Sequence, residues 1–345
     1  MTKFMSKSIM ILFIIFSCLC FFSIANAEKE ITLRISSFLP SFHIINKVFL
    51  EPWAKKIEKR TNGKLKMKLY PGGTLGKAKN QYDMVVRGVA DIAWGVTGYT
   101  PGRFPLTSVI ELPFMVPSDE IGCRIIQRLY DEGYLKNEFD DVKLLALFTP
   151  PATDLHTRKK LVKNISDFKG LKIRTPSPII GELIKNWGGV PVGLPASEIY
   201  LTLERGVIDG LLIDVNTIIP IKADEVTKYH TKLGVSAAAL FLVMNKKTYT
   251  SLPSDCKKAI NEFSGEWWAY FHGKATDKAA DENWSRLKKD SDRIIYTPSS
   301  QEIDAWKKAA QPIINKWIKD NEEKGLPARK VFDRAMELKN EFSKN

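Results

Sequence analysis

Arg87-Gly88-Val89-Ala90-Asp91-Ile92 and Arg205-Gly206-Val207-Ile208-Asp209-Gly210 repeat one pattern in the two halves of this chain. Each stretch follows an amphipathic segment, and its Gly is the residue that most readily adopts the left-handed conformation at a helix C-terminus. Each Asp leads into a short apolar strand, residues 92–94 in the first copy and 211–213 in the second. Tyr82 precedes the first copy at the same distance as Tyr200 precedes the second. The pattern therefore predicts one similar helix–strand unit in each of two lobes.

The residues around each copy extend this unit. Apolar alternation predicts strands over residues 30–38, 65–70, 144–148, 171–175 and 190–192, and helical spacing predicts helices over 46–59, 77–88, 179–187 and 196–206. Strands that alternate with helices form largely parallel sheets. We expect the apolar strand 237–245 to return to the first lobe, and the chain after residue 254 to be mostly helical.

The first 27 residues have the composition of an export signal peptide. Lys3 and Lys7 flank the start of an apolar run over residues 9–16, which is too short to span a membrane, and Ala25-Asn26-Ala27 supplies a small-x-small cleavage site. Cleavage there predicts a periplasmic protein, residues 28–345, that is long enough for two domains. A retained membrane anchor at Cys18 is the alternative.

Two cysteines, Cys123 and Cys256, remain after that cleavage. The periplasm permits a disulfide, but the spacing does not decide whether the two meet.

The composition and motifs argue against several functions. The formal net charge of +13 is spread along the chain without a nucleic-acid-binding signature. We find no nucleophile elbow, no phosphate-binding loop and no metalloprotease motif. The four histidines, His43, His156, His230 and His272, have no catalytic or metal-ligand spacing. We therefore expect a binding protein without enzymatic activity, metal or cofactor.

Arg174 is the strongest candidate for a ligand contact. It ends the apolar strand Leu171-Lys172-Ile173-Arg174 and precedes Thr175-Pro176. Ligands of open α/β sheets bind beyond the carboxyl ends of the strands. A guanidinium there can bind a carboxylate with two parallel hydrogen bonds. An ordinary surface arginine at a strand end is the alternative.

Several motifs in order resemble one known family. The resemblance lies in Asp167–Arg174, Pro191-Val192, Ser197-Glu198-Ile199-Tyr200 and Gly206–Gly210, and in Tyr70-Pro71, Leu75-Gly76, Gly88–Asp91 and Leu112-Pro113-Phe114. In these motifs the chain is similar to the extracytoplasmic solute-binding proteins of TRAP (tripartite ATP-independent periplasmic) transporters, of the C4-dicarboxylate-binding type.

The resemblance implies a two-lobed α/β periplasmic binding protein fold with a long bridging helix and a helical C-terminus. It divides the chain into residues 28–151 plus 238–279 as lobe I and 152–237 plus 280–345 as lobe II. It also implies a monomer that closes on a small organic carboxylate and delivers it to TRAP membrane permease subunits driven by an ion gradient.

The family's arginine that pairs with the substrate carboxylate corresponds to Arg174. A second family arginine falls on Asp154 in a gapless register, and a family asparagine falls on Ile213, with Asp214 and Asn216 close by. Asp154 then either faces a cationic group of the ligand or pairs with Arg158. We therefore expect C4-dicarboxylates to bind weakly, and monocarboxylates or zwitterions to bind better.

Aromatic residues complete the predicted site. Trp94 ends a cleft-facing strand and Tyr99 follows it, while Phe38 and His43 lie after the first strand. Such rings pack on apolar or cationic parts of a ligand, although core packing is the alternative for Trp94.

Two other classes of protein stay open from the sequence. An ABC-type periplasmic binding protein for an amino acid or other zwitterion has the same two-lobed architecture. A secreted hydrolase or lyase is the more remote alternative.

Overall fold

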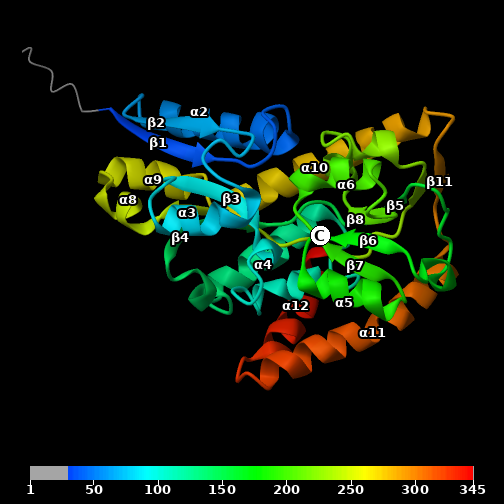
Figure 1. The fold of residues 1–345 in the computed structure, drawn as a ribbon. Helices are drawn as coiled ribbons and strands as arrows, with labels where there is room; N and C mark the ends of the chain where they lie inside the picture. The colour runs from blue at the N-terminus through cyan, green and yellow to red at the C-terminus, as the bar shows by residue number, and fades with distance from the viewer. Residues whose placement is uncertain (1–29, 345) are drawn as a thin grey trace, which may run out of the picture.

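The computed structural model describes residues 30–344, so the predicted signal peptide lies outside the described residues. Two β-sheets form two lobes beside each other (Figure 1). The sheet of lobe I has the order β2-β1-β3-β10-β4, and that of lobe II the order β11-β9-β5-β8-β6-β7. The strands are β1 (Ile31–Ser36), β2 (Leu65–Tyr70), β3 (Ile92–Val96), β4 (Val142–Phe148), β5 (Asp154–Thr157), β6 (Lys172–Thr175), β7 (Val190–Gly193), β8 (Gly210–Ile213), β9 (Tyr229–Thr231), β10 (Leu240–Asn245) and β11 (Ile294–Tyr296).

The helices are α2 (Glu51–Arg60), α3 (Gln81–Val86), α4 (Asp119–Asp131), α5 (Pro178–Asn186), α6 (Ile199–Glu204), α7 (Val215–Ile218), α8 (Lys246–Ser251), α9 (Ser254–Glu262), α10 (Glu266–Lys288), α11 (Ser300–Glu322) and α12 (Ala328–Phe342). Shorter helical segments are η1 (Ile45–Leu50), η2 (Ala78–Asn80), η3 (Thr97–Tyr99), η4 (Thr107–Glu111), η5 (Lys136–Phe139), η6 (Ile165–Phe168), η7 (Ala196–Glu198) and η8 (Ala223–Val226).

The sequence repeat is a repeat of structure. The parallel strands β2-β1-β3 of lobe I have the same order as β7-β6-β8 of lobe II. Gly88 and Gly206 adopt left-handed φ angles of 73° and 71° at the two helix ends, where an L side chain would be strained.

The two aspartates of the repeat have the same structural role. The Asp91 carboxylate accepts a hydrogen bond from the Arg34 N–H of β1 at 2.8 Å. The Asp209 carboxylate accepts one from the Lys172 N–H of β6 at 2.9 Å. Each Asp therefore fixes the strand that follows it against the first strand of its unit.

Each sheet is mixed because the chain crosses between the lobes. β10 follows lobe II in the sequence but lies in the sheet of lobe I, antiparallel to β3 and β4. β5 is antiparallel to β8 and β9. The predicted α/β fold and the return of strand 237–245 to lobe I are thus confirmed, while the crossing strands make the sheets less parallel than expected.

Helix α10 packs against α4 and β4 of lobe I and against α7 of lobe II, and so bridges the lobes. Helix α11 packs on α5 of lobe II. The assignment of residues 280–345 to lobe II is wrong for α12, which packs on α4 (Figure 1). Its apolar face, including Val331 and Leu338, joins the core of lobe I.

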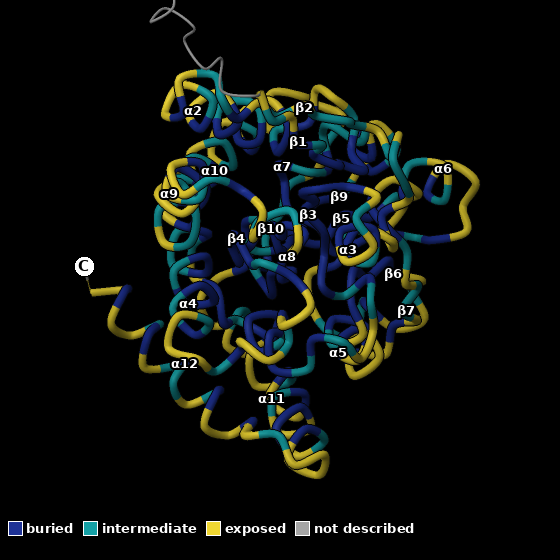
Figure 2. The backbone as a smooth tube through the Cα atoms, turned by 90° about the vertical axis from the view of Figure 1, so that its left-hand side faces the viewer, coloured by how far each residue is buried: buried dark blue, intermediate teal, exposed yellow. Residues whose placement is uncertain are grey.

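The core follows the two sheets. The strands are largely buried, and the helices that surround them expose one side to solvent (Figure 2). Within residues 30–344, no helix combines the length and the apolar character needed to cross a membrane.

Candidate functional site

A cleft between the lobes gathers every predicted site residue except Asp154. From this set the lining holds Phe38, Trp94, Tyr99, Arg174, Ile213, Asp214 and Asn216. The other lining residues, mostly apolar, are Leu39, His43, Ile44, Ile45, Val96, Pro150, Pro151, Thr153, Pro176, Ala196, Thr217, Ala238, Leu240, His272 and Thr276. The carboxyl ends of β1 and β3 face those of β6 and β8 across this cleft.

Arg174 is buried, with 2% of its surface exposed. Its Nε donates to the Leu194 carbonyl at 2.9 Å, and its Nη1 is 3.4 Å from the Leu212 carbonyl. Its Nη2 donates to the Tyr99 hydroxyl at 3.2 Å. A guanidinium carries five N–H donors, so two remain without an acceptor among the described residues.

The guanidinium of Arg174 also has no ion-pair partner. Among residues 30–344, no carboxylate lies within ion-pair distance of it, and the buried Asp214 carboxylate acts on its charge from a greater distance. Burial lowers the pKa of Arg174 from its ordinary value because desolvation disfavours the charged form. A buried cation without an ion-pair partner is costly, so the site favours an anion.

Tyr99 joins the two lobes at this point. Its hydroxyl oxygen accepts from Arg174 and, at 2.9 Å, from the Ala196 N–H, and both partners belong to lobe II. The oxygen is thus occupied as an acceptor, while its proton has no acceptor among the described residues. Arg174 and Tyr99 together offer N–H and O–H donors at one place.

Two aromatic rings line the lobe I wall. Phe38 stacks on Trp94 with ring centroids 4.4 Å apart, and Tyr99 meets the edge of Phe38 at 6.0 Å. The Trp94 indole N–H donates to the Ser37 hydroxyl at 2.8 Å, which fixes the ring. Trp94 is buried in the core and also lines the cleft, and its contact with a ligand stays a prediction.

The lobe II residues after β8 are held by the backbone. Asp214 caps α7 and accepts from the Thr217 N–H at 2.9 Å. Burial raises the pKa of Asp214 to about 6. The Asn216 amide donates to the Thr276 carbonyl of α10 at 2.9 Å, so α10 and the cleft wall are linked.

Asp154 does not line the cleft, and its predicted ion pair with Arg158 is wrong. The Asp154 carboxylate accepts from the Gly234 N–H at 2.9 Å, in the segment through which the chain leaves lobe II. Arg158 lies at the other end of β5, where its guanidinium is 3.5 Å from the Glu204 carbonyl. Opposite ends of an extended strand cannot bring these side chains together.

The Asp154 contact belongs to a pairing of two interlobe crossings. The Thr153 N–H donates to the Ser236 carbonyl, and the Val235 N–H donates to the Thr153 carbonyl at 3.0 Å. Burial raises the pKa of Asp154 to about 7, and the backbone N–H of Gly234 opposes this rise. Asp154 therefore stabilises the junction between the lobes.

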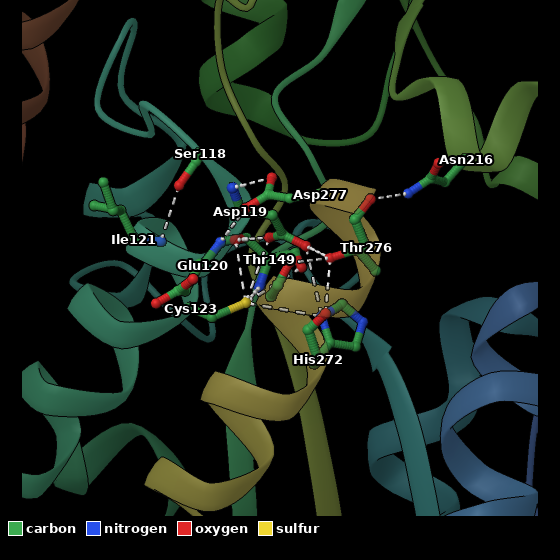
Figure 3. Close-up of polar contacts among 11 residues, drawn as sticks. Ser118, Asp119, Glu120, Ile121, Cys123, Thr149, Asn216, His272, Thr276 and Asp277 are labelled. Carbon is green, nitrogen blue, oxygen red and sulfur yellow. Dashed lines mark hydrogen bonds and ion pairs between the residues drawn. The ribbon is translucent and has the colours of Figure 1, made fainter. Parts of the chain in front are cut away.

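A buried polar network lies where α4 meets α10 (Figure 3), and two of its members, His272 and Thr276, line the cleft. Asp119, Cys123 and His272 place potential metal-ligand atoms within 4.8 Å of one another, a grouping that the sequence spacing did not predict. Thr149 and Thr276 donate hydroxyl hydrogen bonds to the two Asp119 oxygens. These protein donors satisfy the carboxylate without a cation.

The two described cysteines are separate. Cys123 and Cys256 are both buried and form no disulfide with each other, which answers the question that their spacing left open.

The histidines of lobe II form a second buried contact away from the cleft. The His156 and His230 Nδ1 atoms are 2.7 Å apart, and burial lowers the pKa of His230 to about 4. Since neither residue lines the cleft, this pair is part of the lobe II core.

A two-lobed protein with a buried arginine in its interlobe cleft belongs to the class of ligand-binding proteins. Residues 35–320 match the family described as bacterial extracellular solute-binding protein, family 7. The chain belongs to this family, the solute-binding proteins of TRAP transporters, and its function is to bind small organic acids.

Relatives and solved structures agree with this assignment. A solute-binding protein of Verminephrobacter eiseniae is 30% identical over 68% of this chain and 71% of its own length. A marine metagenome TRAP solute-binding protein specific for aromatic acids is 31% identical, with a TM-score of 0.88 over 90% of this chain and 99% of that chain. A TRAP protein from Rhodoferax ferrireducens, solved with copurified benzoate, is 29% identical, with a TM-score of 0.88 over 91% and 99%.

Proposed function

We propose that the ligand of this TRAP solute-binding protein is a small aromatic monocarboxylic acid. Its carboxylate binds Arg174 and the Tyr99 hydroxyl, and its ring packs on Phe38 and Trp94. The observation that carries this proposal is the burial of the Arg174 guanidinium without a carboxylate partner among residues 30–344. An anionic group of the ligand supplies that partner.

The positive charge of Arg174 can pair with one carboxylate of the ligand. Among residues 30–344, Arg174 is the only arginine or lysine that lines the cleft, and Asp214 adds an acidic group. A second ligand carboxylate would meet Asp214 or apolar residues without a compensating charge, and an unpaired buried charge is costly. This agrees with the expectation that C4-dicarboxylates bind weakly.

The apolar wall favours an aromatic body. Apart from Arg174 and Asp214, the cleft is lined mainly by aromatic, aliphatic and proline side chains. The stacked pair Phe38 and Trp94 presents a flat surface, and aromatic pairs gain about 0.5–1.5 kcal/mol beyond area burial. The two structurally similar proteins with an aromatic acid in their descriptions support the same choice.

A zwitterion is the second candidate, and Asp214 rather than Asp154 would recognise its cation. One relative, the ectoine-binding protein TeaA of Halomonas elongata, is 24% identical over 75% of this chain. In this chain the Asp214 carboxylate is already bonded to the start of α7, which makes it a weaker partner for an ammonium.

The loaded protein would deliver its ligand to TRAP membrane permease subunits. Export by the predicted signal peptide would place it in the periplasm, where the members of this family act. This delivery needs no catalysis, since the protein has only to bind the ligand and release it.

A thermal-shift and calorimetry panel tests the ligand class. The panel compares the binding of five compounds to the purified protein at pH 7: benzoate, phenylacetate, succinate, malate and ectoine. A ligand at 100 times its Kd stabilises the folded state by about 2.7 kcal/mol. We expect the aromatic acids to raise Tm and to bind with the lowest Kd. Tight binding of succinate or malate with no response to aromatic acids would contradict the proposal.

The affinity for benzoate is expected to depend on pH through Asp214. Burial raises its pKa to about 6, so this group loses its proton as the pH rises from 5 to 7.5. The resulting negative charge repels the ligand carboxylate, and affinity falls with rising pH. Each pKa unit by which bound ligand raises the Asp214 pKa corresponds to about a tenfold change in Kd. Calorimetry at both pH values measures the change.

Asp214→Asn is the control for this pH effect. Asn is a good helix N-cap, so the start of α7 is preserved while the titration is lost. We expect the pH dependence of the variant to be flatter over the same range. Equal pH profiles of wild type and variant would assign the effect to other buried acids, such as Glu111 or Asp154.

A further inference from the structure

His43 occupies an unusual position on the lobe I wall of the cleft. It follows β1, and its carbonyl accepts from the N–H groups of Asn46 and Lys47 as the next helical segment begins. Its side chain is 4% exposed and lines the cleft. The sequence analysis placed it among the aromatic candidates of the site without a catalytic or metal-ligand spacing, and the structure places it on the cleft wall.

The hydrogen bonds of His43 determine which ring nitrogen carries the proton. The Ile45 N–H donates to His43 Nδ1 at 3.2 Å, so Nδ1 is an acceptor and carries no proton. Burial lowers the pKa of His43 to about 3, so the ring is neutral at neutral pH. A neutral imidazole with an unprotonated Nδ1 has its proton on Nε2.

This Nε2–H is a donor without an acceptor. Within residues 30–344, eight buried side-chain polar atoms have no hydrogen-bond partner, and His43 Nε2 is the one that belongs to a residue lining the cleft. Leaving a buried donor unpaired destabilises the protein, because the group has lost its hydrogen bonds to water without gaining others. An acceptor atom on a bound ligand would remove this cost.

The His43 ring and the Arg174 guanidinium line the cleft from different lobes, His43 after β1 and Arg174 in β6. Arg174 is bonded to Tyr99, Leu194 and Leu212, and none of these contacts His43 through a hydrogen bond. A carboxylate bound by Arg174 therefore leaves His43 Nε2–H available.

We propose that His43 is a specificity-determining residue whose Nε2–H binds an oxygen substituent on the body of the ligand. This proposal rests on the proposed aromatic-acid function and narrows it. The preferred ligands carry a hydroxyl or carbonyl oxygen on the ring or side chain in addition to the carboxylate. A site built to donate to such an oxygen discriminates against the analogue that lacks it.

Two substitutions distinguish the roles of the two ring nitrogens of His43. His43→Asn places an amide oxygen near the position of Nδ1, retains an acceptor for the Ile45 N–H and removes the distal donor. His43→Gln places an amide N–H near the position of Nε2 and restores that donor. Both side chains are neutral and polar, so the pair controls for burial and charge.

The test measures Kd by calorimetry for benzoate and for its 2-, 3- and 4-hydroxy derivatives with wild type and both variants. We expect at least one hydroxybenzoate to bind about tenfold or more tightly than benzoate in the wild type. His43→Asn should abolish this preference, and His43→Gln should retain part of it.

The possible outcomes are distinguishable. If benzoate binds and no hydroxy isomer is preferred, or if His43→Asn keeps the preference, the role of His43 is contradicted while the proposed function stands. If none of these acids binds the wild type, the aromatic-acid function fails and this proposal fails with it.

Discussion

Arg174→Lys is expected to weaken the binding of benzoate by about 30-fold or more, which corresponds to roughly 2 kcal/mol. The substitution keeps a cationic side chain but loses the planar fork that binds a carboxylate with two hydrogen bonds. It also removes the donor of the Leu194 carbonyl and one of the two donors to the Tyr99 hydroxyl. Burial favours a neutral amine, so the lysine would lose part of its charge as well.

The matched control is Arg158→Lys in the same lobe. Arg158 follows a strand of the same sheet and bonds a backbone carbonyl, but it does not line the cleft. Calorimetry with benzoate should give a wild-type Kd for this control, and thermal unfolding should show that both variants fold. A Kd for Arg174→Lys within about twofold of wild type would remove Arg174 from the centre of the site.

The parts of the fold that could be predicted from the sequence are those specified by the short pattern that both halves share. Gly88 and Gly206 end their helices because each adopts a left-handed φ angle. Asp91 and Asp209 then fix the next strand by hydrogen bonds to the first strand of the unit. These contacts recur in both halves, so a short repeated pattern was enough to predict two similar lobes.

The wrong predictions concern side chains whose partners are distant in the sequence. A gapless register placed Asp154 in the cleft, but its partner is the backbone of Gly234 in the return crossing. The lobe assignment of α12 failed for a similar reason, since its apolar face packs on α4, which is distant in the sequence. Residue spacing in the sequence predicts neither the contact of Asp154 with Gly234 nor that of α12 with α4.

His43 shows a further limit of sequence patterns. A lone histidine after a strand is most often a structural residue, and its hydrogen bond with Ile45 fits that interpretation. Its role in the cleft depends on an unpaired Nε2, which only the surrounding atoms reveal. The signal available in the sequence was its position on the loop after β1, beside Phe38.

Gly98→Ala is expected to block closure of the cleft and to weaken benzoate binding by at least about tenfold. Gly98 lies in η3 of lobe I, against Pro176 and Ser177 of lobe II. An added Cβ would lie 2.4 Å from the Ser177 Cβ and 2.6 Å from the Pro176 carbonyl oxygen. Backbone atoms cannot rotate away as a flexible side chain does, so the lobes must separate. The hydrogen bonds of Tyr99 to Arg174 and Ala196 would lengthen with them.

Gly193→Ala is the matched control, because a Cβ at this exposed end of β7 meets no atom within 4 Å. Small-angle scattering should show that the radius of gyration of wild type and of this control falls when benzoate is added, since a ligand that contacts both lobes favours the closed state. The Gly98→Ala protein should keep the larger radius at the same benzoate concentration, with each lobe still folded because the steric conflict exists only between lobes. Ligand-induced compaction and a wild-type Kd in this variant would show that the contact at Gly98 does not govern closure.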